Sequence, residues 1–272
     1  MRFRCKMIDS LAMRDFTNIV NAISKMSKLC VLQLAPDDVC FTVLDDRMPI
    51  VWAELSRDHF FNEYLIFGMS EEQNRILLEF DALMLAKSLV SLKASAKSVK
   101  IKLTNKQQPC LTLEIELLSL ITDWQCVHDV PIRIIHRREW AAYQAPNIPD
   151  FDITIELPPL KHIRNVVEKM KNMSPYLTIV ANNDGAFILK IDTDSASVAT
   201  HYRDLQVWKK IETNADEVFA TVDIRRLLNI HTWDAVHPDS VKCNILHERI
   251  VYLYFKLNDS INIHYFVPAV AI

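Results

Sequence analysis

Two short acidic motifs hold the residues of this chain best suited to chemistry. Asp192 and Asp194 are one residue apart and could hold a metal ion, while His128 and Asp129 could form part of a general-base pair. The first motif follows a strand-like run, where turn aspartates are common. The second has no visible nucleophile to act on. Both motifs favour a structural interpretation, so we expect no catalytic residue, no metal site and no cofactor.

The chain contains only two glycines, Gly68 and Gly185. Loops that cradle phosphate need glycine, because the backbone must approach the phosphate closely with a positive φ. The sequence therefore excludes a P-loop and a dinucleotide-binding fingerprint, and with them most nucleotide-dependent enzymes. Gly185 follows Asn183 and Asp184 between two strand-like runs, which predicts a tight hairpin turn.

The six cysteines never fall into C-x-x-C spacing, and most lie in apolar runs where buried free thiols are common. We expect neither a zinc site nor a disulfide framework. No apolar run approaches the roughly 18 residues of a membrane span, and residues 1–9 lack the apolar stretch of a signal peptide. The sequence thus favours a cytosolic or nuclear protein without a membrane partner.

The same order of elements occurs twice along the 272 residues. Each half begins with a strand that leads into an amphipathic helix, continues through several strands to a second helix, and ends with three strands. Residues 136–150 hold two prolines and no sustained periodicity, which is typical of a connector. We therefore predict an N-terminal domain over 1–135, a connector over 136–150 and a C-terminal domain over 151–272.

The expected helices cover about 11–26, 81–96, 160–172 and 225–231. Their apolar spacing predicts that the first buries Phe16, Ile19, Ile23 and Met26, and that the third buries Leu160, Ile163, Val167 and Met170. The expected strands are 3–8, 28–34, 39–44, 50–55, 98–105, 110–118 and 126–135 in the first half, and 151–157, 176–180, 186–191, 197–202, 218–224, 240–246, 250–257 and 261–267 in the second. No element is predicted between the strand at 50–55 and the helix at 81–96.

The predicted helices are basic although the chain is mildly acidic. The segments 10–28, 81–97, 160–171 and 223–231 hold twelve lysines and arginines against four acidic residues, whereas the whole chain has a net charge of −3. A single lysine-rich helix is usually just a solvated one. Four such helices indicate a common surface that faces a polyanion. The candidate DNA-facing residues are Arg14, Lys25, Lys28, Lys87, Lys93, Lys161, Lys169 and Arg225.

Several strings, taken in order, resemble the PCNA-like sliding clamps, and more closely the Hus-type subunit of the heterotrimeric DNA-damage checkpoint clamp. They are FFNEY (60–64), KIKLTNKQQPCLT (100–112), HDVPI (128–132), VVEKMKNMS (166–174), THYRDL (200–205) and FVPA (266–269). The chain departs from the replicative clamps in lacking an acidic C-terminal tail and in carrying Arg137, Arg138, Trp140 and Tyr143 in its connector.

The resemblance implies an α+β DNA-clamp fold of two topologically similar domains, each with antiparallel sheets outside and two helices on the inner face. It implies a non-enzymatic subunit that joins two related clamp subunits in a ring around double-stranded DNA, without sequence specificity. An ATP-driven clamp loader would place the ring at damage sites, where it would serve checkpoint signalling and repair proteins. The implied location is the nucleus, although the sequence has no clear basic import cluster.

The resemblance also implies two further sets of residues. The edges that join subunits would contain Val127, His128, Val130, Ile132 and Ile134 in one strand, and Ser197, Val198, Ala199, Thr200 and Tyr202 in another. Pro131 agrees with an edge position, because proline within a strand belongs at a sheet edge. A peptide pocket would contain Ile148, Pro149, Val267, Pro268 and Ala269.

Two alternatives remain open at the level of the sequence. One is a homotrimeric replicative clamp, which would self-assemble as an isolated chain. The other is a two-domain metal-dependent hydrolase that uses Asp192 and Asp194, which would copurify with metal.

Overall fold

The chain folds into two compact units, Met1–Ala145 and Pro146–Ile272, in a computed structural model. The structure describes all residues except 46–47, 69–73, 93–95, 118–123, 213–214 and 272. The division between the units lies inside the segment 136–150.

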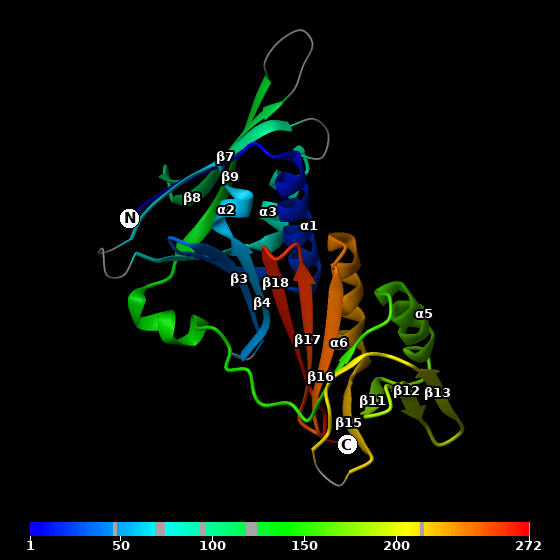
Figure 1. Cartoon of the computed structure of the whole chain (residues 1–272). Helices are drawn as coiled ribbons and strands as arrows, with labels where there is room; N and C mark the ends of the chain where they lie inside the picture. Colours follow the sequence, from blue (N-terminus) through cyan, green and yellow to red (C-terminus); the bar gives the residue numbers. More distant parts are fainter. Residues whose placement is uncertain (46–47, 69–73, 93–95, 118–123, 213–214, 272) are drawn as a thin grey trace. The chain divides into compact units, whose positions relative to one another are not determined.

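Unit 1 combines antiparallel strands with helices (Figure 1). Its elements are β1 (Arg2–Met7), α1 (Ser10–Met26), β2 (Leu29–Leu34), β3 (Asp38–Asp45), β4 (Met48–Ser56), α2 (Arg57–Phe60), β5 (Glu63–Phe67), β6 (Ile76–Asp81), α3 (Ala82–Ser88), β7 (Ala96–Asn105), β8 (Pro109–Leu117), β9 (Trp124–Ile134) and the 3₁₀ helix η1 (Arg137–Tyr143).

Unit 2 repeats this plan. Its elements are β10 (Ile153–Glu156), α5 (Leu160–Met170), β11 (Tyr176–Asn182), β12 (Phe187–Asp192), β13 (Ser197–Tyr202), β14 (Val207–Lys209), β15 (Glu217–Asp223), α6 (Ile224–Leu228), the 3₁₀ helix η2 (Asn229–Val236), β16 (Ser240–Leu246), β17 (Ile250–Leu257) and β18 (Ile261–Pro268).

Strand order shows that the two units are copies of one design. Unit 1 has the order β4-β3-β2-β6-β9-β8-β7-β1-β5. Unit 2 has a sheet β13-β12-β11-β15 and a sheet β18-β17-β16-β10-β14, and an isolated bridge from Val222 to Ala269 joins β15 to the segment after β18. Each strand of one unit thus has a counterpart in the other, so the repeat predicted from the sequence is confirmed.

Strand β9 links the two halves of the sheet in unit 1. Residues 124–131 pair with β8, whereas Ile132, Arg133 and Ile134 pair with β6. The change of partner follows Pro131, which lacks the N–H that a continuous ladder would need. The predicted link between this proline and a sheet edge therefore holds for the first part of β9 only.

Several elements differ from the sequence expectation. The helix predicted over 81–96 is found as α3 over Ala82–Ser88 only; residues 93–95 of that range lie outside the described residues, and Ala96 already begins β7, where pairing with β8 requires extended backbone. Strands β5, β6 and β14 and helix α2 were not predicted. The predicted helix 225–231 is a five-residue α-helix followed by η2, and seven residues of the connector form η1.

The hairpin predicted at Gly185 is confirmed. Strands β11 and β12 pair in antiparallel register from Thr178↔Lys190 to Ala181↔Phe187, and Gly185 in the turn has a φ of +79°. A Cβ at this position would lie 2.4 Å from the carbonyl oxygen of Leu205, so only glycine fits without a shift of the backbone.

The helices of each unit pack on the buried face of its strands. In unit 1, α1 packs beside α3, and in unit 2, α5 packs beside α6 and η2 (Figure 1). The aromatic ring of Phe16 on α1 contacts that of Phe41 on β3. Trp233 on η2 is fully buried against Phe255 on β17. Large buried side chains thus fix the helices on the sheets.

Candidate nucleic-acid and subunit interfaces

Helix α1 separates an apolar face from a polar one. Asp9 caps the start of the helix, and its Oδ1 accepts the backbone N–H of Ala12 at 2.8 Å. Phe16, Ile19 and Ile23 are at most 3% exposed, as the helical periodicity predicts. The predicted buried stripe of this helix is therefore confirmed at these three positions, whereas its fourth residue, Met26, is only partly buried.

The exposed face of α1 carries two of the predicted DNA-facing residues, Arg14 and Lys25. Arg14 Nε lies 3.5 Å from Oδ1 of the buried Asp15, so part of its positive charge is compensated within the helix. Lys25 lies in the last turn, where a cation also stabilises the helix through the backbone dipoles. Lys25 therefore contributes the less compensated charge of this face.

The other candidates of unit 1 lie at different places. Lys28 is exposed but follows the end of α1, and its carbonyl oxygen accepts the N–H of Ala82 at 2.8 Å. This bond places Lys28 at the start of α3. Lys87 is exposed in the last turn of α3. Lys93 lies outside the described residues.

Helix α5 repeats the pattern of α1 in unit 2. Leu160, Ile163, Val167 and Met170 are buried, as predicted, and each is at most 5% exposed. Lys161 and Lys169 are exposed. The apolar contacts of the buried stripe hold the helix in place independently of these two lysines.

A third basic residue of α5 has its charge compensated on the helix. Arg164 Nε donates to Glu168 Oε1 at 2.8 Å, an exposed pair spaced i, i+4. The guanidinium lowers the pKa of Glu168, which keeps this carboxylate ionised.

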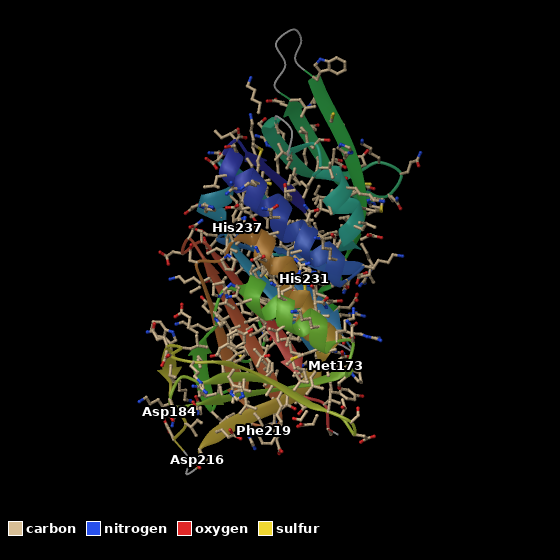
Figure 2. All side chains as sticks on the ribbon, turned by 90° about the vertical axis from the view of Figure 1, so that its right-hand side faces the viewer. Met173, Asp184, Asp216, Phe219, His231 and His237 are labelled. Carbon is tan, nitrogen blue, oxygen red and sulfur yellow. The ribbon has the colours of Figure 1, made fainter. Side chains whose placement is uncertain are left out.

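In Figure 2, Met173 after α5 and His231 on η2 lie on the helical side of unit 2, whereas Asp184 and Asp216 lie at the other end, beside the strands.

The last candidate on a helix is Arg225 at the start of α6. Its side chain is exposed, and its backbone N–H donates to Asp223 Oδ1 at 2.8 Å, which caps the helix. Sequence reasoning also passed over Arg226, whose carbonyl oxygen accepts the hydroxyl of the buried Tyr265 at 2.6 Å. Both units therefore carry exposed basic residues on their helices.

Strand β13, one of the two predicted subunit edges, is the end strand of the four-stranded sheet of unit 2. It pairs with β12 from Phe187↔Tyr202 to Asp192↔Ser197. The side chains of Ser197 and Ala199 are exposed, while Val198, Thr200 and Tyr202 are partly buried. An end strand presents backbone N–H and C=O groups that another strand can pair with.

Strand β9, the other predicted edge, is free to pair with a strand of another chain over only part of its length. Val127 is 53% exposed and His128 is partly buried, in the stretch that pairs on one side with β8. Val130 is 1% exposed and faces the core. Ile132 and Ile134 pair with β6, so including them in a free edge was wrong. The free part of β9 ends at Pro131.

Each of the two edges carries a buried polar atom without a hydrogen-bond partner among the described residues. These atoms are His128 Nε2 on β9 and Tyr202 Oη on β13. Burial also raises the pKa of Tyr202, so its hydroxyl stays protonated. A buried polar group without a partner costs stability, and a partner chain is one means of satisfying it.

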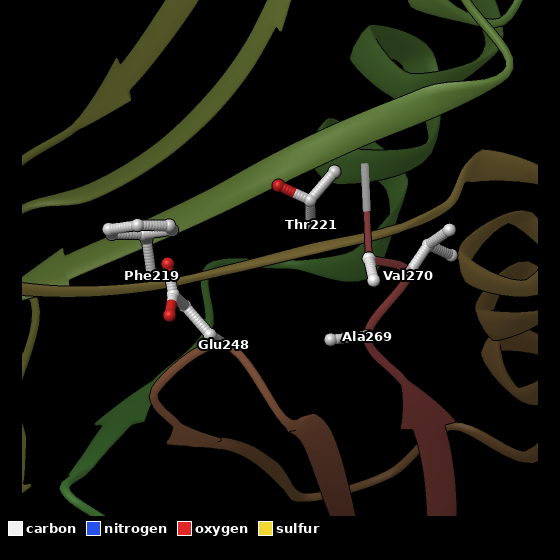
Figure 3. Close-up of a pocket in the computed structure, with 6 residues that line it drawn as sticks. Phe219, Thr221, Glu248, Ala269 and Val270 are labelled. Atoms are coloured by element: carbon white, nitrogen blue, oxygen red, sulfur yellow. The ribbon is translucent and has the colours of Figure 1, made fainter.

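The predicted peptide pocket is only partly assembled. A cavity of about 390 Å³ in unit 2 contains Ala269, and its other lining residues are Phe219, Thr221, Glu248, Val270 and Ala271 (Figure 3). The N–H of Val270 donates to the carbonyl of Thr221 at 2.8 Å, which fixes the last residues of the chain against β15.

The remaining predicted pocket residues do not line this cavity. Ile148 is 48% exposed, Pro149 is partly buried and Pro268 is exposed. Val267 is fully buried and pairs with Val251, so its side chain cannot contact a peptide while β18 is folded. Its inclusion in the pocket was wrong, because alternation along β18 turns it towards the core.

In the acidic motifs, Asp192 and Asp129 have structural partners, and Asp194 is exposed. Asp192 accepts hydrogen bonds from Lys190 Nζ at 2.7 Å and Ser197 Oγ at 2.6 Å, and both lower its pKa. Asp129 accepts from Lys106 Nζ at 2.6 Å and from a threonine of β8 at 2.5 Å. Within the part of the chain that the structure describes, no cluster of His, Cys, Asp and Glu could hold a metal ion.

The six cysteines are free thiols, and all but Cys126 are buried. Burial raises the pKa values of Cys5, Cys30 and Cys243, so these thiols are neutral and unreactive. Among the described residues, no helix has the length and apolar character required to cross a membrane.

Comparison with known proteins places this architecture in a family. The model of the family described as Hus1-like protein matches residues 1–271. This chain belongs to the Hus1-like family. Over the full length of both chains it is 38% identical to the human checkpoint protein HUS1, and it is 28% identical to the checkpoint protein Hus1-like of Drosophila melanogaster over 99% of each chain.

Further comparisons agree with this assignment. The Hus1-like chain is 31% identical to the checkpoint protein hus1 of Schizosaccharomyces pombe over 76% of this chain and 71% of that protein. Its fold is similar to that in the PCNA2–PCNA3 complex from Sulfolobus tokodaii, with a TM-score of 0.66 and 13% identity over 98% of each chain. The predicted α+β clamp fold is therefore confirmed.

The family also decides between the functions left open by the sequence. The Hus1-like chain is a non-enzymatic checkpoint clamp subunit, because its full-length relatives are checkpoint proteins and its own fold is that of a clamp. The metal-dependent hydrolase and the homotrimeric replicative clamp are not favoured. The residues that this subunit uses remain predictions at each position described above.

Proposed function

We propose that this chain joins two related clamp subunits in a heterotrimeric ring that encircles double-stranded DNA at sites of damage in the nucleus. An ATP-driven loader places the ring on DNA, and checkpoint and repair proteins then use it as a platform. The two domains of the proposed subunit are residues 1–135 and 151–272, with residues 136–150 as the connector.

The main support for a ring is that the chain has two dissimilar strand edges. The free part of β9 belongs to unit 1 and β13 belongs to unit 2, and each has a buried polar atom that lacks a partner among the described residues. Two different edges on one chain pair head to tail with different neighbours, and such a contact closes into a ring when the rotation between subunits permits it. In this proposal, partner strands satisfy His128 Nε2 and Tyr202 Oη.

The basic faces of the helices support the proposal that the ring binds DNA. Exposed cations lie on helices of both units, at Lys25 and Lys87 in unit 1 and at Lys161, Lys169 and Arg225 in unit 2. The buried sides of α1 and α5 hold the fold, so these cations are available to phosphates. Phosphate contacts carry no base information, which suits a ring that moves along any sequence.

The cavity beside Ala269 supports the role of platform. The side chains of Phe219 and Val270 supply apolar surface, and the end of the chain is held there by backbone hydrogen bonds. We propose that a short segment of a repair or checkpoint protein binds here, with Ile148, Pro149 and Pro268 outside the main contact.

The test combines assembly with topology. The chain is coexpressed with candidate clamp subunits, and the mass of the purified complex is measured by native mass spectrometry. We expect one copy of each of three different chains, and no trimer from this chain alone. The complex is then loaded on circular DNA, where it should be retained until the circle is cut. A homotrimer, or equal retention on circular and linear DNA, would contradict the proposal.

A further inference from the structure

A second cavity of about 390 Å³ lies in unit 1, between η1 and the strands β2, β3, β4 and β6. It shares no residue with the cavity beside Ala269. Three aromatic side chains and three charged side chains supply its distinctive chemistry, and they are Trp52, Trp140, Tyr143, Asp38, Glu54 and Arg75.

The aromatic walls of this cavity are held in place. Trp52 is 5% exposed, and its Nε1–H donates to Glu54 Oε1 at 2.8 Å. The Nε1–H of Trp140 donates to the carbonyl oxygen of Ile135 at 3.1 Å. Trp140 and Tyr143 also pack against a buried cluster on β2, β6 and Ile135. Their rings therefore need little ordering when a ligand enters.

An ion-pair network fixes η1 over the strands. Arg133 on β9 forms a two-pronged bond to Glu79 on β6, with Nε–Oε1 and Nη2–Oε2 distances of 2.9 and 3.2 Å. Its Nη1 also donates to Glu139 Oε2 on η1 at 3.0 Å. One guanidinium thus joins the wall formed by η1 to the sheet.

The charges in the cavity favour a cation. Asp38 and Glu54 lie on adjacent strands, offset by two residues in the register of β3 and β4, so they share one face of the sheet. Burial, followed by the negative charge of Glu54, raises the pKa of Asp38. The positive charge of Arg75 lowers this pKa. Because Asp38 and Glu54 are negative and Arg75 is positive, the lining carries one net negative charge.

We propose that this cavity binds the cationic side chain of an arginine or lysine presented by a partner protein. A cation beside Asp38 and Glu54 relieves the repulsion between their carboxylates, and it lies against rings whose faces attract positive charge. Arginine fits best, since its planar guanidinium stacks on aromatic rings and donates hydrogen bonds to two carboxylates. The inference goes beyond ring formation and DNA binding, and it is tested on the full chain alone.

The test uses the indole N–H signals of the five tryptophans in an ¹⁵N–¹H spectrum. The probe is N-acetylarginine methylamide, and its neutral partner is N-acetylcitrulline methylamide, which has nearly the same shape. We expect the arginine compound to shift the signals of Trp52 and Trp140 in a saturable manner, and to leave those of Trp124, Trp208 and Trp233 unchanged. The citrulline compound should bind at least about fivefold more weakly.

Two variants separate charge from shape. Asp38→Asn combined with Glu54→Gln should weaken the arginine probe by at least about fivefold, because the rings remain while the negative charge is lost. A matched control, Asp184→Asn combined with Asp216→Asn, removes two exposed charges from unit 2 and should not change binding (Figure 2). Unchanged signals of Trp124, Trp208 and Trp233 in each free variant show that the fold is intact, whereas the Trp52 signal itself responds to Glu54→Gln because its N–H donates to that side chain.

The outcomes decide the proposal. Preference for arginine over citrulline, lost in the first variant and kept in the control, supports it. Equal shifts by both compounds would assign the cavity to a neutral side chain and overturn the proposal. Absence of a saturable shift at Trp52 and Trp140, or unchanged binding by Asp38→Asn/Glu54→Gln, would overturn it as well.

Discussion

Replacement of Lys161 and Lys169 by glutamine tests the proposed DNA-facing surface most directly. Both side chains are exposed on α5, and the buried residues of that helix are untouched, so folding and subunit assembly should be unchanged. If each lysine neutralises one phosphate, the double variant releases about two fewer counterions, and the slope of log K against log salt falls by about 1.8.

This slope predicts a defect that depends on ionic strength. Relative to the unaltered ring, the variant should bind double-stranded DNA about 60-fold more weakly at 0.1 M salt and about ninefold more weakly at 0.3 M, if the two are equal at 1 M. The neutral glutamines keep most of the side-chain volume. The loss should therefore be electrostatic and should be the same for different base sequences.

The assay is a salt series of DNA-binding titrations with the assembled ring, using two DNA sequences. The matched control in the same unit is Lys210→Gln combined with Arg249→Gln, which removes two exposed cations from the end of β14 and the turn before β17. Its salt slope should equal that of the unaltered ring. Equal slopes for the Lys161/Lys169 variant and the unaltered ring, or an equal loss in the control, would refute the placement of DNA against α5.

Three other predictions concern assembly and stability. Val127→Glu puts a charge on the free part of β9 and should reduce the ring population in native mass spectrometry at least about tenfold, with unchanged thermal unfolding of the isolated chain; an undiminished ring would contradict this. Hydrogen bonds, first from Lys106, lower the pKa of Asp129. In urea unfolding at pH 7, the unaltered chain should therefore have a larger free energy of unfolding than the Asp129→Asn variant. This difference should disappear as the pH falls below about 4 and through the lowered pKa. Gly185→Ala should lower the free energy of unfolding by at least about 2 kcal/mol, because its Cβ would meet the Leu205 carbonyl at positive φ, whereas equal stability would show that the turn can relax.

The sequence by itself determined the repeated plan and the faces of its helices. The apolar spacing in α1 and α5 determined which side chains are buried. A helix has 3.6 residues per turn, so apolar residues three or four positions apart lie on the same face whatever surrounds the helix. The turn at Gly185 also followed from local sequence, since Asn-Asp-Gly between two strand-like runs allows few conformations other than a hairpin turn. The resemblance to checkpoint clamps came from short strings in a fixed order, which no single fold rule would have supplied.

Only the tertiary structure decided how strands share partners and where cavities form. β9 leaves β8 for β6 after Pro131, which removes Ile132 and Ile134 from the free edge, and alternation along β18 buries Val267 away from any ligand. The cavity under η1 brings together Trp52 and Trp140, which are far apart in the sequence. Periodicity describes the environment of one element at a time, whereas edges and cavities depend on non-local pairing, which is fixed by the packing of the whole unit.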